Sequence, residues 1–180
     1  MASAHQQETL PDRGRPHRGD SIARSVQRGV AGLLAAAEIA CSPAQVPRHL
    51  AGLHRTRVWT GASAARLVSR LHDRAMAQAN TAVADYGARS ELRLYLSTFP
   101  DNTAALAALD AMLRGIHTGK TPFAPPQEQQ GMPGRWVTYG PGGHQMLWVS
   151  HCQLYWLQGD AETVERAAGE LPAPLAGVWT

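Results

Sequence analysis

Two short strand-like runs near the C-terminus, residues 144–150 and 153–158, constrain the fold more than any other part of the sequence. Only two residues separate the runs, and such a short connection between alternating apolar runs is typical of a β-hairpin. In the register that this turn imposes, Trp148 faces Tyr155, and an aromatic cross-strand pair of this kind fixes the alignment of two strands. The sequence therefore predicts an antiparallel hairpin here, within a larger antiparallel sheet.

Residues 91–99 form a second strong strand pattern. Leucines occupy alternate positions from Leu92 to Leu96, whereas Arg93 and Tyr95 lie between them. Strict alternation is the pattern of a strand with one face on the core and one face in solvent. We expect a half-buried strand here, together with shorter strands at residues 57–60 and 135–139.

Three segments carry helical patterns. The residues after Thr60–Ser63 run to Asp85 without proline or glycine, which predicts a long helix with an aliphatic face and an arginine stripe of Arg66, Arg70 and Arg74. Asp101 or Asn102 can cap a second helix over residues 103–116. A third helix is expected over residues 160–171.

These elements predict an α+β fold with one antiparallel sheet of about four to five strands and helices on one face, in a ferredoxin-like or related βαββα arrangement. Hydrophobic residues make up 44% of the 180 residues, which is enough for one core. We expect a single domain over residues 42–180, preceded by a separate N-terminal segment over residues 1–41.

The N-terminal segment has the layout of an export signal. Residues 1–20 are polar and are expected to be disordered, and arginines at 24 and 28 precede an apolar run over residues 29–40. Cys41 then stands where a bacterial lipoprotein carries its lipid, although Glu38 departs from that pattern. A cut after Ala37 would instead release a soluble periplasmic protein, and an ordinary amphipathic helix over residues 21–40 is the remaining interpretation.

The charge is distributed unevenly along the chain. Residues 42–93 contain eight arginines and three acids, whereas residues 94–180 contain four basic and seven acidic residues. The net charge of +3 therefore does not describe a uniform nucleic-acid-binding surface, and the pattern does not favour a nucleic-acid partner.

The aromatic residues of the predicted sheet and the arginine stripe are the candidate interaction residues. Sheet aromatics can stack on single-stranded RNA, but the interleaved glycine, phenylalanine and lysine of RNA-binding sheets are absent, which favours core and partner packing. The stripe could hold phosphate or an acidic partner, although a solvated charged face is the commoner case. The candidates are Trp136, Tyr139, Trp148, Tyr155, Arg66, Arg70 and Arg74.

No catalytic, metal or cofactor site is predicted. The run Gly115–Thr121 has three residues rather than four between its glycines and follows a helix, so it is not a phosphate loop. His144 lies at the far end of the hairpin from His151 and Cys152, too distant to share a metal ion with them. The two cysteines could pair, but the sequence does not require it.

Residues 146–160 resemble the closing hairpin of small exported bacterial lipoproteins and of extracytoplasmic domains of anti-sigma factors. In those domains a tryptophan strand, a turn and a strand of the form YxLxGD lead into a final helix. Residues 84–87, followed by 92–99, resemble the first half of such lipoproteins. The resemblance covers about 100 residues and implies export and protein contact, with no catalytic residues.

The sequence thus favours an exported, non-enzymatic accessory or interaction domain, docked on a membrane-associated complex by a protein partner or attached to the membrane by lipid on Cys41. The alternative is a cytoplasmic ligand- or nucleic-acid-binding module of ferredoxin-like topology. An enzyme is the reading that the sequence supports least.

Overall fold

The structure is a computed structural model, and it describes residue 41 and residues 45–69, 80–119 and 121–174. The chain divides into two units, Met1–Ala37 and Glu38–Thr180, and every described residue belongs to the second. The predicted disordered segment and the predicted signal or helix over residues 1–40 lie outside the described residues.

Eight strands and three helices are found in the described part of the chain. In order they are β1 (His49–Leu50), β2 (Leu53–Thr60), α1 (Gly61–Ser69), β3 (Asn80–Tyr86), β4 (Leu92–Thr98), α2 (Asn102–His117), β5 (Gln127–Glu128), β6 (Arg135–Gly140), β7 (Gly143–Ser150), β8 (Gln153–Gly159) and α3 (Ala161–Glu170).

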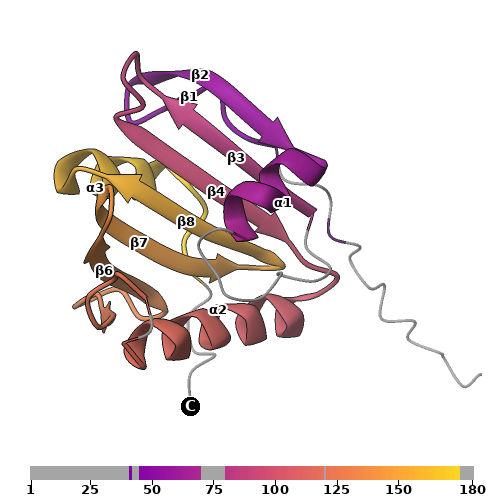
Figure 1. Cartoon of the computed structure of the whole chain (residues 1–180), viewed down its shortest axis with the longest axis vertical. Helices are drawn as coiled ribbons and strands as arrows, with labels where there is room; N and C mark the ends of the chain where they lie inside the picture. Colours follow the sequence, from indigo (N-terminus) through magenta and orange to yellow (C-terminus); the bar gives the residue numbers. More distant parts are fainter. Residues whose placement is uncertain (1–40, 42–44, 70–79, 120, 175–180) are drawn as a thin grey trace, which may run out of the picture. The chain divides into compact units, whose positions relative to one another are not determined.

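The strands form one antiparallel sheet in the order β1-β2-β3-β4-β8-β7-β6-β5. The β4–β8 pair joins the four strands of the first half of the chain to the four strands of the second half (Figure 1). The hairpin predicted at β7 and β8 is confirmed: Ser150 pairs with Gln153 across a two-residue turn, and Trp148 pairs with Tyr155.

Helices cover both faces of this sheet. On one face, α1 and α2 pack on a core that includes Tyr95, Leu147 and Trp156. On the other face, α3 packs on a second core that includes Leu94, Trp148 and Leu157. Adjacent residues of β4, β7 and β8 therefore point into different cores, and these strands are buried on both sides.

The predicted fold class was wrong in its architecture, although the mixture of helices and antiparallel strands is present. The sheet has eight strands rather than four to five, its helices lie on both faces, and its strand order is not ferredoxin-like. The strand at residues 91–99 was expected to be half-buried, but Tyr95 packs against Trp156 and Arg93 is paired with the buried Asp85. Its polar residues therefore do not mark a solvent face.

The long helix predicted to follow Thr60–Ser63 and to run to Asp85 was wrong in its extent. Helix α1 is described over Gly61–Ser69, but residues 80–86 form strand β3 between β2 and β4. The segment Asn80–Tyr86 has no internal helix breaker, but it pairs with a neighbouring strand along both edges, and such tertiary pairing overrides local preference. The two other helices are confirmed, and Asp101 and Asp160 cap them by accepting hydrogen bonds from Ala104 N and Thr163 N.

Candidate functional site

A disulfide links Cys41, eight positions before the start of β1, to Cys152 in the β7–β8 turn. The two residues are separated by 111 positions, so the bond closes almost the whole described domain into a loop. In this turn His151 adopts a left-handed conformation with φ of 52°, and the Cys152 carbonyl accepts a hydrogen bond of 2.9 Å from Phe99 N just after β4. The predicted lipidation site is thus engaged through its sulfur in this structure.

The four candidate aromatic residues are in different environments. Trp148 and Tyr155 are buried and stacked, with ring centroids 5.0 Å apart, so they belong to the core. Trp136 is partly buried against the α2-side core, whereas Tyr139 is 59% exposed. Of these four side chains, Tyr139 is the one that a partner could reach most directly.

Of the predicted arginine stripe, Arg66 alone lies within the described residues. Arg66 is exposed on α1. Arg70 and Arg74 lie outside the described residues. The described arginines that do cluster lie instead on β2 and on the segment before it.

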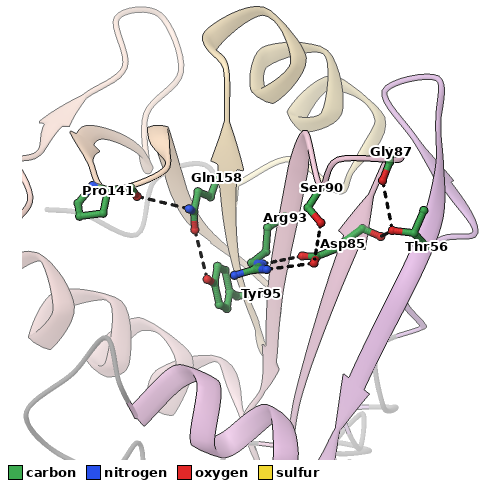
Figure 2. Close-up of polar contacts among 8 residues, drawn as sticks. All are labelled: Thr56, Asp85, Gly87, Ser90, Arg93, Tyr95, Pro141 and Gln158. Atoms are coloured by element: carbon green, nitrogen blue, oxygen red, sulfur yellow. Dashed lines mark hydrogen bonds and ion pairs between the residues drawn. The ribbon is translucent and has the colours of Figure 1, made fainter.

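An ion pair between the buried Asp85 and the partly exposed Arg93 anchors the β3–β4 hairpin (Figure 2). Asp85 is 1% exposed, and its carboxylate accepts hydrogen bonds from Arg93 Nε at 2.6 Å, Arg93 Nη2 at 3.0 Å and Ser90 Oγ at 3.0 Å. The hydrogen bond to Asp85 raises the pKa of Arg93. Because the carboxylate is fully engaged, Asp85 serves structure rather than proton transfer.

A polar row continues from this pair across the centre of the sheet. Tyr95 Oη on β4 hydrogen-bonds Gln158 Oε1 on β8 at 3.2 Å, and Gln158 Nε2 donates to the Pro141 carbonyl in the β6–β7 turn at 3.4 Å (Figure 2). Next to it, Gln145 Oε1 accepts from Trp156 Nε1 at 2.7 Å. These groups hydrogen-bond one another, so the row links strands β4, β8 and β7.

His144 is the least satisfied polar side chain on the α3 face. It is 6% exposed, its ring contacts Tyr139 edge-on, and neither ring nitrogen hydrogen-bonds another described group. Burial lowers the pKa of His144, and the negative charge of Glu165 opposes that shift. Its imidazole is therefore a neutral core group at pH 7.

A basic edge, defined by Arg48, His49, His54, Arg55 and Arg57, runs along β1 and β2. Residues 45–69 contain four arginines and two histidines but no aspartate or glutamate. A surface pocket of about 500 Å³ lies at one end of this edge and is lined by Gln45, Val46, Pro47, Arg48 and Arg55. This is the densest positive charge in the part of the chain that the structure describes.

The comparisons with known proteins found no relative. No protein-family model, no curated protein and no solved structure matches the chain. Among the described residues, no group of three or more His, Cys, Asp or Glu side chains could hold a metal ion. Within the same residues, no helix is both long and apolar enough to cross a membrane.

The sequence analysis missed two structural features, the Asp85–Arg93 pair and the basic edge. Arg93 was interpreted as a solvent-facing residue because Asp85 was placed at the end of a predicted helix, whereas it lies on β3 directly opposite Arg93. The basic edge was missed because a strand was expected only over residues 57–60 of this region, and only the arginine excess of residues 42–93 indicated it.

The Asp85–Arg93 pair yields a stability prediction. Arg93→Ala leaves the buried carboxylate without its bidentate partner and should lower the free energy of unfolding by about 3 kcal/mol. The double variant Asp85→Asn/Arg93→Ala should recover part of that loss, because no buried charge is then left unpaired. Urea unfolding of the two variants and of Asp85→Asn measures the coupling, and strictly additive losses would contradict the pairing.

The neutral state of His144 yields a pH prediction. The unfolded chain binds a proton on His144 near the ordinary pKa of 6.5, whereas the folded protein binds it only at lower pH. The free energy of unfolding should therefore fall as pH drops through about 6.5, and His144→Phe should flatten that fall. The control is His117→Phe at the exposed end of α2, and an equal pH slope in wild type and His144→Phe would refute the assignment.

Proposed function

We propose that this protein is an exported, non-enzymatic interaction domain, held at a membrane-associated complex by a protein partner. The observation that carries the proposal is the Cys41–Cys152 disulfide. Disulfides persist in oxidising compartments such as the periplasm and are rare in the reducing cytosol. An α+β domain that pairs its only two cysteines suits an oxidising compartment.

The disulfide also bears on how the protein would be retained. A cysteine sulfur forms either a disulfide or the thioether of a lipid anchor, so Cys41 cannot hold both at once. With Cys41 joined to Cys152, protein contacts would have to retain the domain at a membrane complex. A cut after Ala37 would leave Cys41 inside the mature chain and able to pair.

The polar contacts support a binding role over a catalytic one. Several charged and polar groups at the centre of the sheet are hydrogen-bonded to one another, as in the Asp85–Arg93 pair and the Tyr95–Gln158 contact, whereas His144 is buried as a neutral group. A general acid or base needs a free, accessible group whose pKa suits its task, and the shifts of the buried groups here follow from burial or pairing. The exposed, unbalanced charge of the basic edge is instead what a binding surface offers.

The cysteine redox state in the native host tests the proposal. Cells are quenched in acid, fractionated by osmotic shock, and treated with a polymer-linked maleimide before and after reduction. The protein should be found in the periplasmic fraction and should react only after reduction, whereas Cys41→Ser should expose one reactive thiol on Cys152. Purified reduced protein should also lose about 2–5 kcal/mol of stability, since a large loop is opened.

Two results would decide against the proposal or part of it. A full-length cytosolic protein whose thiols react without reduction would overturn export. A mass for a chain that starts at Cys41 and carries lipid would keep export but replace the protein-held form by a lipid-anchored one.

A further inference from the structure

We propose that the outer edge of β2 binds an extended acidic segment of the partner protein, which adds to the sheet as a further strand. This inference rests on the proposed interaction role and names the chemistry of the partner. It concerns residues 56–60, the part of β2 that lies beyond the short strand β1.

Among the described residues, none but β3 pairs with this part of β2, because the segment before β1 turns away from it. Strand β1 pairs only with Leu53 and His54, and one further backbone bond joins Arg55 N to Arg48 O at 2.9 Å. The preceding residues are then tied down elsewhere: Tyr86 Oη donates to Pro47 O at 3.0 Å, and Arg55 Nη1 donates to Val46 O at 2.7 Å. Within the described residues, β2 beyond Arg55 therefore pairs with β3 alone.

A β-bulge places positive charge on both faces of this edge. Arg55 pairs with Tyr86 and Arg57 with the neighbouring Asp85, so Thr56 is the extra residue. Because adjacent residues of β3 face opposite sides of the sheet, Arg55 and Arg57 do so as well. A strand added to this edge would thus meet an arginine on each of its faces.

Nearby acids do not neutralise these arginines. The carboxylate of Asp85 is engaged by Arg93 and Ser90, and Glu170 accepts a hydrogen bond from Ala51 N at 3.0 Å. Arg48 and Arg57 are exposed. An acidic segment would therefore meet positive charge that the domain itself leaves largely uncompensated.

The edge also presents apolar side chains to a bound strand. Val58 is 42% exposed, and Trp59 on the opposite face is partly buried beneath the Arg93 guanidinium, 5.8 Å from its ring centroid. In strand addition, backbone hydrogen bonds provide affinity and the alternating side chains provide selectivity. The preferred ligand is therefore an extended segment that alternates acidic and apolar residues.

The charge argues against two other occupants. Pairing of β2 with β2 of a second copy would bring Arg55 and Arg57 of both chains together, and charged residues on edge strands oppose such self-association. The chain's own residues 1–28 contain five arginines and three acids, so they also carry the wrong sign. An acidic segment from another protein is the occupant that the edge suits.

Binding of a defined peptide tests the inference with the full-length oxidised protein. The probe is a fluorescent eight-residue peptide of alternating valine and acidic residues, measured by anisotropy at low salt. Arg57→Glu and Arg48→Glu should each weaken binding about five- to tenfold, whereas Arg114→Glu on α2 makes the same charge change away from the edge and should have little effect. Hydrogen exchange should show new protection at residues 56–60 in the complex.

Three outcomes would overturn the inference. The first is equal binding of a peptide whose alternate amides are N-methylated, since such a peptide cannot add as a strand. The second is no loss of binding in Arg57→Glu. The third is binding of anionic phospholipid vesicles without binding of the peptide. The thiol and fractionation measurements are independent of this test. An exported, oxidised protein that ignores the peptide would remove only the β2 inference, whereas a reduced cytosolic protein would remove the proposed function.

Discussion

The pairing of β4 with β8 is the interaction on which the rest of the structure depends. It is in register over seven residue pairs, from Leu92–Gly159 to Thr98–Gln153, and it joins the two halves of the chain. Each strand sends alternate side chains into different cores: Leu94 and Leu157 face α3, whereas Tyr95 and Trp156 face α1 and α2. The pair also needs Gly159, since a Cβ there would lie 2.6 Å from the Glu91 carbonyl oxygen.

Burial on both faces of the sheet explains why polar groups at its centre pair with one another, whereas charge collects at its margins. Polar groups at the centre must be paired to be buried, and the Asp85–Arg93 pair and the Tyr95–Gln158 contact meet that requirement. The strands at the margins of the sheet pair with a neighbour along one edge only, or pair along their second edge for a short length. The basic edge lies at one of these margins, where charge remains in contact with solvent.

Local signals in the sequence were sufficient for the β7–β8 hairpin and for the helices that Asp101 and Asp160 cap, because turn length and capping act over a few residues. They failed for β3, since Asn80–Tyr86 becomes a strand by pairing along both edges. They failed again for the faces of β4, where Arg93 resembles a solvent-facing residue until its partner is known. The extent of the sheet, and hence the strand order, depended on these non-local pairings.

For the candidate interaction residues, too, local sequence patterns were not sufficient. A high density of aromatic residues marks a core as readily as a binding surface, and Trp148 and Tyr155 are core residues. The proposed binding edge of β2 depends on the hydrogen bond between Tyr86 and Pro47, which holds the preceding segment away from it. No local sequence pattern reveals that contact. The Cys41–Cys152 pairing spans 111 positions, so the sequence could only leave it open.

Hydrogen exchange of the free, oxidised full-length protein tests the central claim, an open basic edge on a doubly covered sheet, most directly. Backbone amides of β4 and β8 should exchange at the rate of global unfolding, whereas a subset of amides in residues 56–60, those directed away from β3, should exchange far faster. Uniform protection of residues 56–60 at the level of β8 would contradict the account, because another part of the chain would then cover the edge.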